Sequence, residues 1–110
     1  MTPPNRTLDQ TFAALGDRTR IEIVIRLSRG SASVSELAEP FDLTLRAVLK
    51  HVEVLEDAGI VRTTKLGRVR RCELERARLE RAVRWIDQVQ RRWDRRLDRL
   101  EKYVHTQEGT

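Results

Sequence analysis

The sequence is poor in cysteine and in long apolar runs, and each shortage excludes a class of protein. A single cysteine among 110 residues excludes an internal disulfide framework and fits a reducing compartment. No apolar run approaches the roughly 20 residues that span a bilayer. The first ten residues, MTPPNRTLDQ, lack the apolar stretch of a signal peptide. We therefore expect a soluble, cytoplasmic protein.

Aromatic residues are also few, at 5% of the chain. The hydrophobic core therefore has to be built mainly from Leu, Ile, Val and Ala. The length of 110 residues suffices for one domain. Acidic residues are outnumbered 17 to 22 by basic ones, which leaves a net charge of +5. Such a balance favours a polyanionic partner, although charge alone equally fits simple solubility.

Residue patterns typical of enzymes and metal sites are missing as well. The chain has no Cys/His cluster with zinc-ligand spacing, no phosphate-binding glycine loop and no nucleophile motif. Cys72 alternates with the inward positions of an expected strand, so we predict a buried, inert thiol, with a redox role as the minor alternative. These absences predict a protein that is not an enzyme and uses no cofactor or metal.

The first half of the chain carries several helix-start signals. Thr7 with Gln10 predicts a capping box that opens a helix through Leu15, after a disordered tail of residues 1–6. Asp17 is expected to cap a second helix. The apolar positions that we expect to form its buried face are Ile21, Val24, Ile25 and Leu27.

A short helix and a longer one follow in quick succession. Ser33 and Glu36 form a second predicted capping box, for a segment that Pro40 ends. Thr44 is expected to cap a helix over 45–58, which Gly59 closes by adopting the left-handed conformation. Its inward positions are predicted to be Val48, Val52 and Leu55.

The next segment, residues 61–74, predicts a β-hairpin with a turn at Leu66-Gly67-Arg68. Its charge is one-sided, because Glu73 is the single acid in it. The basic residues of the hairpin are Arg62, Lys65, Arg68, Arg70 and Arg71.

From residue 75 to 105 the apolar spacing becomes helical again, and a short tail, 106–110, is expected after it. The stripe spans roughly 38 Å, too much for so small a domain to cover, so we expect it to meet a second chain. Three acid-before-base pairs, Glu80–Arg84, Asp87–Arg91 and Asp98–Lys102, are expected on the solvated face. The predicted dimerisation residues are Phe12, Leu79, Ile86, Val89, Trp93, Leu97 and Leu100.

This order of elements predicts a mainly α, winged helix-turn-helix fold, with a DNA-binding domain over 7–74 and a dimerisation helix over 75–105. In such a unit the second helix enters the major groove, and the hairpin, or wing, contacts backbone or minor groove. The alternative is that this helix and the hairpin are ordinary charged surfaces that contact only solvent. The predicted DNA-binding residues are Thr44, Arg46, Ala47, Lys50 and His51 in the helix, and Lys65, Arg68 and Arg70 in the wing.

The segments LGDRTRIEIVIRLSRG, SVSELAEPFDLTLRAVLKHVEVLEDAGIV and LGRVRRCEL together resemble the ArsR-type transcriptional regulators. The resemblance implies a homodimeric repressor that releases DNA when a signal arrives, and the two-fold symmetry of such a dimer predicts an inverted-repeat operator. Two departures stand out. ELAEPFDL stands where metal-sensing members have a cysteine motif that binds the metal. The paired metal-binding His and acidic residues of the last helix are also missing, since His105 is the only histidine there. The resemblance therefore implies the metal-independent branch. Leu49 replaces a serine common in such members, so no DNA contact is transferred to it.

Two functions therefore remain open on the sequence. The first is a dimeric, sequence-specific DNA-binding regulator, most simply a repressor. The second is an adaptor that has kept the winged-helix scaffold but binds proteins instead of DNA. The basic hairpin argues against the adaptor, because it would be unusual on a surface made for apolar partners.

Overall fold

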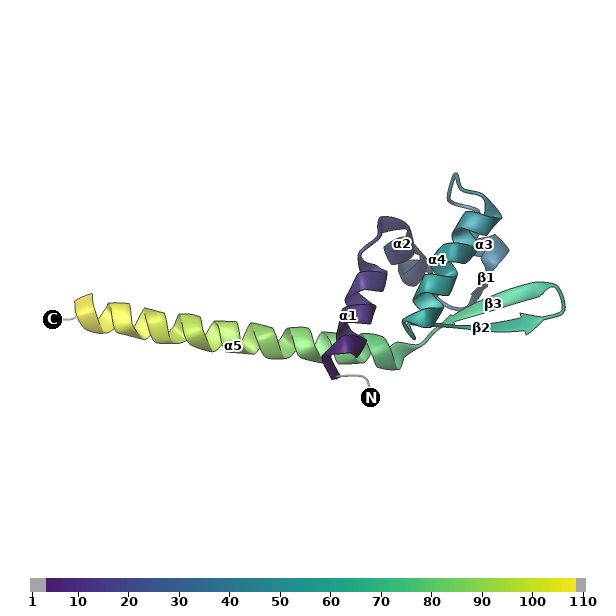
Figure 1. The fold of residues 1–110 in the computed structure, drawn as a ribbon. Helices are drawn as coiled ribbons and strands as arrows, with labels where there is room; N and C mark the ends of the chain where they lie inside the picture. The colour runs from purple at the N-terminus through teal and green to yellow at the C-terminus, as the bar shows by residue number, and fades with distance from the viewer. Residues whose placement is uncertain (1–3, 109–110) are drawn as a thin grey trace.

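The computed structural model describes residues 4–108 as five helices and a three-stranded sheet. The helices are α1 (Pro4–Leu15), α2 (Arg18–Leu27), α3 (Val34–Ala38), α4 (Leu45–Asp57) and α5 (Arg76–Glu108), and the strands are β1 (Ala32–Ser33), β2 (Val61–Leu66) and β3 (Val69–Leu74). The molecule measures 74 × 36 × 20 Å because α5 extends far from a compact body formed by the other elements (Figure 1). The predicted winged helix-turn-helix fold is confirmed.

The first helix begins earlier than predicted. Helix α1 starts at Pro4, which suits the first helical turn because its missing N–H has no partner there in any case. Thr7 is thus an interior residue, whose carbonyl accepts a hydrogen bond from the Thr11 hydroxyl at 3.0 Å. The predicted capping box at Thr7 is wrong. The predicted disordered tail of residues 1–6 is wrong for residues 4–6, which are helical. Residues 1–3 lie outside the described residues.

Helix α2 is capped as predicted, and its predicted buried face is confirmed in part, because Leu27 is 3% exposed and Val24 packs against the core. The Asp17 carboxylate accepts a hydrogen bond from the Arg20 backbone N–H at 3.1 Å. Ile23 is fully buried, whereas Ile21 and Ile25, predicted to face inward, are 43% and 52% exposed. Apolar residues dominate the segment from Ile21 to Leu27, so periodicity alone does not select a face. Packing of α2 against α4 makes the choice.

The helix-turn-helix itself follows the sequence closely. Ser33 and Thr44 accept hydrogen bonds from the backbone N–H groups of Glu36 and Ala47, each at 3.1 Å, and so cap α3 and α4. Val48, Val52 and Leu55 are fully buried on one side of α4. Gly59 ends the helix with a φ of 75°, a conformation that costs other residues energy.

The sheet contains one strand that the sequence did not indicate. The hairpin β2–β3 turns at Gly67, whose φ is 63°. The two-residue strand β1 pairs with β3, giving the order β1-β3-β2, with Ala32 opposite Cys72 and Ser33 opposite Arg71. Strand β1 therefore joins the start of α3 directly to the wing.

Helix α5 is covered only near its beginning. Ala82 is 4% exposed, and Leu79 packs against the core of the body. Beyond them the apolar stripe is open: Trp93 is 58% and Leu100 56% exposed. The helix continues to Glu108 rather than ending at residue 105, and residues 109–110 lie outside the described part.

Of the three ion pairs expected along α5, only Asp87–Arg91 forms among residues 4–108, with Oδ2 and Nε 3.0 Å apart. The other two acids have no ion pair in this part of the chain, as is common for exposed helix residues. None of the helices described is long and apolar enough to cross a membrane.

Candidate nucleic-acid interface

The first turns of α4 present two cations to solvent. Arg46 and Lys50 are both exposed, one helical turn apart, on the side opposite the buried Val48 and Val52. Neither cation has an ion pair with any residue from 4 to 108. Thr44 lies at the same end of the helix, where its hydroxyl is already occupied by the cap and free backbone N–H groups remain.

The wing lies beside this face of α4. Arg70 Nη1 on β3 lies 3.9 Å from Glu53 Oε1, which is on the outer side of α4 one turn after Lys50. A groove of about 590 Å³ separates the two elements. It is lined by Ser33, Val34, Ser35, Leu45, Leu49, Glu53, Lys65, Arg68, Val69 and Arg70. The helix and the wing tip thus share one side of the molecule.

Contacts with acids divide the basic residues of the wing into two groups. Arg62 lies 3.5 Å from a Glu73 oxygen and 3.8 Å from a Glu75 oxygen, and Arg71 lies 3.8 Å from Glu36. Lys65 and Arg68 are exposed near the turn and have no ion pair within the described residues. The positive charge that is not already compensated therefore lies at the tip of the wing.

His51 is placed differently from the other predicted residues of α4. Its Nδ1 lies 3.3 Å from Arg20 Nη1 and 3.8 Å from Asp17 Oδ1, so the ring faces the junction of α1 and α2. The hydrogen bond from the Arg20 backbone lowers the pKa of Asp17, and the nearby His51 acts in the same direction. This placement favours a packing role for His51 over the predicted DNA contact. Ala47 is partly buried at the edge of the exposed face.

The described residues show neither an activated cysteine nor a cluster of metal ligands. Cys72 is fully buried in the middle of β3, and this burial raises the pKa of its thiol, which is the opposite of an activated cysteine. The predicted burial of Cys72 is confirmed. Residues 4–108 contain no group of three or more His, Cys, Asp or Glu side chains that could hold a metal ion.

Two features of the interface escaped the sequence reasoning. Leu45 is 53% exposed and lines the groove together with the half-buried Leu49, so the face of α4 toward the wing is largely apolar. Glu53 was not among the residues predicted at the interface, but its carboxylate lies next to Arg70. Its spacing of three from Lys50 and seven from Arg46 places it on the same helical face and was the available signal.

The open side of α5 gathers most of the predicted dimerisation residues. Ile86, Val89 and Leu97 are 45–47% exposed, in line with Trp93 and Leu100. Leu79 is the exception, because it packs within its own chain. Phe12 packs against Trp85, with ring centroids 5.5 Å apart, and so attaches α1 to α5. The predicted stripe does not include Trp85.

An exposed cationic helix end beside a basic wing defines a winged helix-turn-helix protein of the DNA-binding class. Comparison with known proteins agrees. The family described as "Helix-turn-helix domain" matches residues 15–64. The Bacillus subtilis HTH-type transcriptional regulator YuzN is 40% identical over 73 residues, which cover 60% of this chain and 79% of YuzN.

A solved ArsR family transcriptional regulator is 44% identical, with a TM-score of 0.79 over 86% of this chain and 97% of its own. An ArsR-like regulator from Rhodococcus sp. RHA1 is 35% identical, with a TM-score of 0.75 over 88% and 92% of the two chains. The arsenical resistance operon repressor of Bacillus subtilis is 37% identical over 57 residues, about half of each chain. The chain belongs to the ArsR family of helix-turn-helix transcriptional regulators.

Proposed function

We propose that this DNA-binding regulator is a homodimeric repressor that reads an inverted-repeat operator. Helix α4 enters the major groove, with Arg46 and Lys50 directed at base edges or phosphates, and Lys65 and Arg68 contact the backbone or minor groove. The observation that carries the proposal is that the exposed cations at the start of α4 and at the tip of the wing, the two elements that border the groove, form no ion pair within residues 4–108.

The dimer follows from the open stripe of α5. A 33-residue helix is about 50 Å long, and its large apolar side chains from Ile86 to Val104 stand about half exposed. So long an apolar surface is costly in water and marks an interaction site. A second copy covers it and sets two α4 helices on one face of DNA, about 34 Å apart. Residues 7–74 are then the DNA-binding part and residues 75–105 the dimerisation part.

Repression is proposed because relatives in sequence carry that description, among them the Bacillus subtilis arsenical resistance operon repressor and the transcriptional repressor SdpR. The sequence lacks the metal-binding cysteine motif, so we propose a metal-independent member without catalytic activity. We propose the cytoplasm as its place of action, because relatives such as YuzN are proteins of Bacillus subtilis, whose DNA lies there.

The proposal is tested by selecting bound DNA from a random pool at controlled salt. The expected product is an inverted repeat whose half-sites lie about 10 base pairs apart, or a multiple of that spacing. Recovery of unrelated sequences would contradict sequence-specific reading. A complete lack of salt-sensitive retention on fragmented genomic DNA would contradict DNA binding and favour the protein-binding adaptor.

A further inference from the structure

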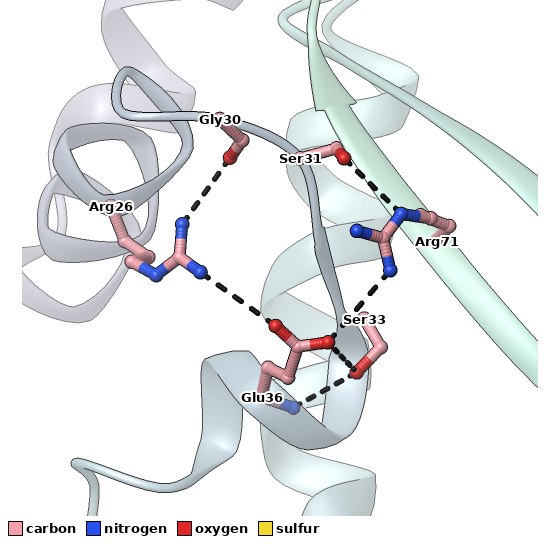
Figure 2. Close-up of polar contacts among 6 residues, drawn as sticks. All are labelled: Arg26, Gly30, Ser31, Ser33, Glu36 and Arg71. Atoms are coloured by element: carbon pink, nitrogen blue, oxygen red, sulfur yellow. Dashed lines mark hydrogen bonds and ion pairs between the residues drawn. The ribbon is translucent and has the colours of Figure 1, made fainter.

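Glu36 lies at a junction of three elements outside the DNA-contacting surface. It is the third residue of α3, and its carboxylate lies between two arginines from elsewhere in the chain (Figure 2). Arg26 Nη2, at the end of α2, lies 3.7 Å from Oε2. Arg71 Nη1, on β3, lies 3.8 Å from Oε1. One carboxylate thus joins α2, α3 and the wing.

Each arginine of this junction is held by a second contact. Arg26 Nη1 donates a hydrogen bond to the Gly30 carbonyl at 3.3 Å, and Arg71 Nε donates one to Ser31 Oγ at 3.1 Å (Figure 2). Ser33, which caps α3, lies 3.3 Å from Glu36 Oε1 through its hydroxyl and pairs with Arg71 in the β1–β3 register. The start of α3 is therefore connected through side chains and backbone to β3 at Arg71, which we call the root of the wing.

These contacts are too weak to stabilise the fold by much, so we assign them to the orientation of the wing. The three charged side chains are 39–48% exposed, and exposed ion pairs contribute about 0–1 kcal/mol each. The neighbouring Leu37, 1% exposed, holds α3 in the core by burial. From Arg71 to Arg68 the strand rises about 10 Å, so a small rotation at the root displaces the tip of the wing.

We infer that Glu36 is a positioning residue for DNA binding, which acts by holding the wing at the angle that brings Arg68 to the nucleic acid. The inference rests on the proposed function, because it assumes that the wing contacts DNA. It adds a residue that touches no nucleic acid itself, since its carboxylate is occupied by Arg26 and Arg71.

Charge and positioning predict opposite effects when Glu36 is neutralised. Glu36→Gln raises the net charge from +5 by one unit, and by charge alone a more basic protein binds DNA more tightly. The residue 36 N–H still donates to Ser33 Oγ, so the helix cap is retained. Loss of the two ion pairs loosens the wing, and binding becomes weaker. The sign of the change therefore separates the two effects.

The experiment measures operator affinity of the full-length protein at one fixed salt concentration. We expect Glu36→Gln to weaken binding about three- to fivefold, which corresponds to the loss of one or two exposed ion pairs. The matched control is Glu22→Gln, which removes the same charge from a surface pair with Arg18 on α2, 3.6 Å apart, and is expected to leave affinity unchanged or slightly higher. Equal or tighter binding by Glu36→Gln would overturn the inference.

A double-mutant comparison with Arg68 distinguishes an effect through the wing from a general loss of stability. In an Arg68→Ala background the same Glu36→Gln change is expected to cost less than about twofold, because the wing contact is already missing. An equal loss in both backgrounds would contradict a role through the wing. Glu36→Asp retains the charge but shortens the side chain, and it should show the same coupling with a smaller loss. Failure of the wild-type protein to select any DNA sequence would instead refute the proposed function.

Discussion

Arg46 and Lys50 show how a single helix meets two environments. Both lie on the exposed side of α4, while Val48 and Val52, between and beyond them in sequence, are fully buried. The side chains that hold α4 in the core are therefore different from those that face outward. A substitution of either cation removes charge from the surface without opening a cavity, so its effect on DNA binding is separable from folding.

Replacement of Arg46 or Lys50 by Ala is expected to weaken binding to the selected operator by about 1–3 kcal/mol for each base edge that the side chain no longer reaches. Random DNA should lose much less, because it offers no matching base edge. The measurement is a competition titration with the two DNAs. Arg99→Ala, which removes the same charge from α5, is the control and should alter both affinities little. Equal losses on the two DNAs would assign the cations to phosphate contacts only.

His51 illustrates the limit of reasoning from residue type. A histidine in the second turn of a DNA-facing helix fits a phosphate contact, yet its ring lies against Asp17 and Arg20. Arg20 also donates a hydrogen bond to the Ala14 carbonyl at 2.6 Å and so connects the end of α1 with α4. Arg20 is 31 residues away from His51 in the chain, and no local pattern indicates such a partner.

At the scale of elements, the wing is a partly neutralised hairpin. Arg62, Arg70 and Arg71 contact Glu73, Glu53 and Glu36 respectively, whereas the two cations near the turn have no ion pair within residues 4–108. Arg70 and Arg71 thus connect the hairpin to α4 and α3, Arg62 pairs within and just after the hairpin, and the two cations near the turn remain available to a polyanion. A count of basic residues in the wing is therefore larger than the number of its cations that have no ion pair within residues 4–108.

Arg68→Ala is expected to reduce affinity on every DNA sequence and to lower the slope of log affinity against log salt by about 1. The measurement is a salt titration on the operator and on random DNA. Arg62→Ala, which removes a guanidinium already paired with Glu73 and Glu75, should change the slope less. An unchanged slope for Arg68→Ala would place this residue outside the interface.

At the scale of the whole molecule, the compact body and the extended helix have different requirements. The body buries Ile23, Leu37, Leu55 and Ile60 almost completely. Beyond Ala82, the large apolar side chains of α5 are exposed, and the helix runs away from the body on the side opposite the wing (Figure 1). The apolar residues of the body are thus buried within one chain, whereas we expect those of α5 to be buried by a second chain.

Sedimentation of the wild-type protein is expected to give about twice the chain mass of 12.9 kDa. Leu97→Lys introduces a charge into the middle of the stripe and should give a monomer that no longer binds the operator, because burying an unpaired charge is strongly unfavourable. Gln88→Lys, on the opposite side of α5, is the control and should leave the dimer intact. A monomeric wild-type protein would contradict the proposed assembly.

What the sequence determined by itself about this protein is local. The caps at Asp17, Ser33 and Thr44 each bind a backbone N–H three residues away, and the turns at Gly59 and Gly67 require a positive φ. Such interactions depend on neighbouring residues alone, so the order of the helices and the hairpin, and with it the winged fold, was predictable. The inward face of α4 was predictable too, because its apolar residues repeat with a clear helical period.

Only the tertiary structure decided which partners distant residues have. It selected Ile23 over Ile21 and Ile25 as the core side chain of α2, directed His51 to Asp17 and Arg20, and added β1 to the sheet. It also brought Arg71 to Ser31, 40 residues away. These outcomes depend on how packed helices and strands set distances across the fold, and a pattern along one segment contains no information on that geometry.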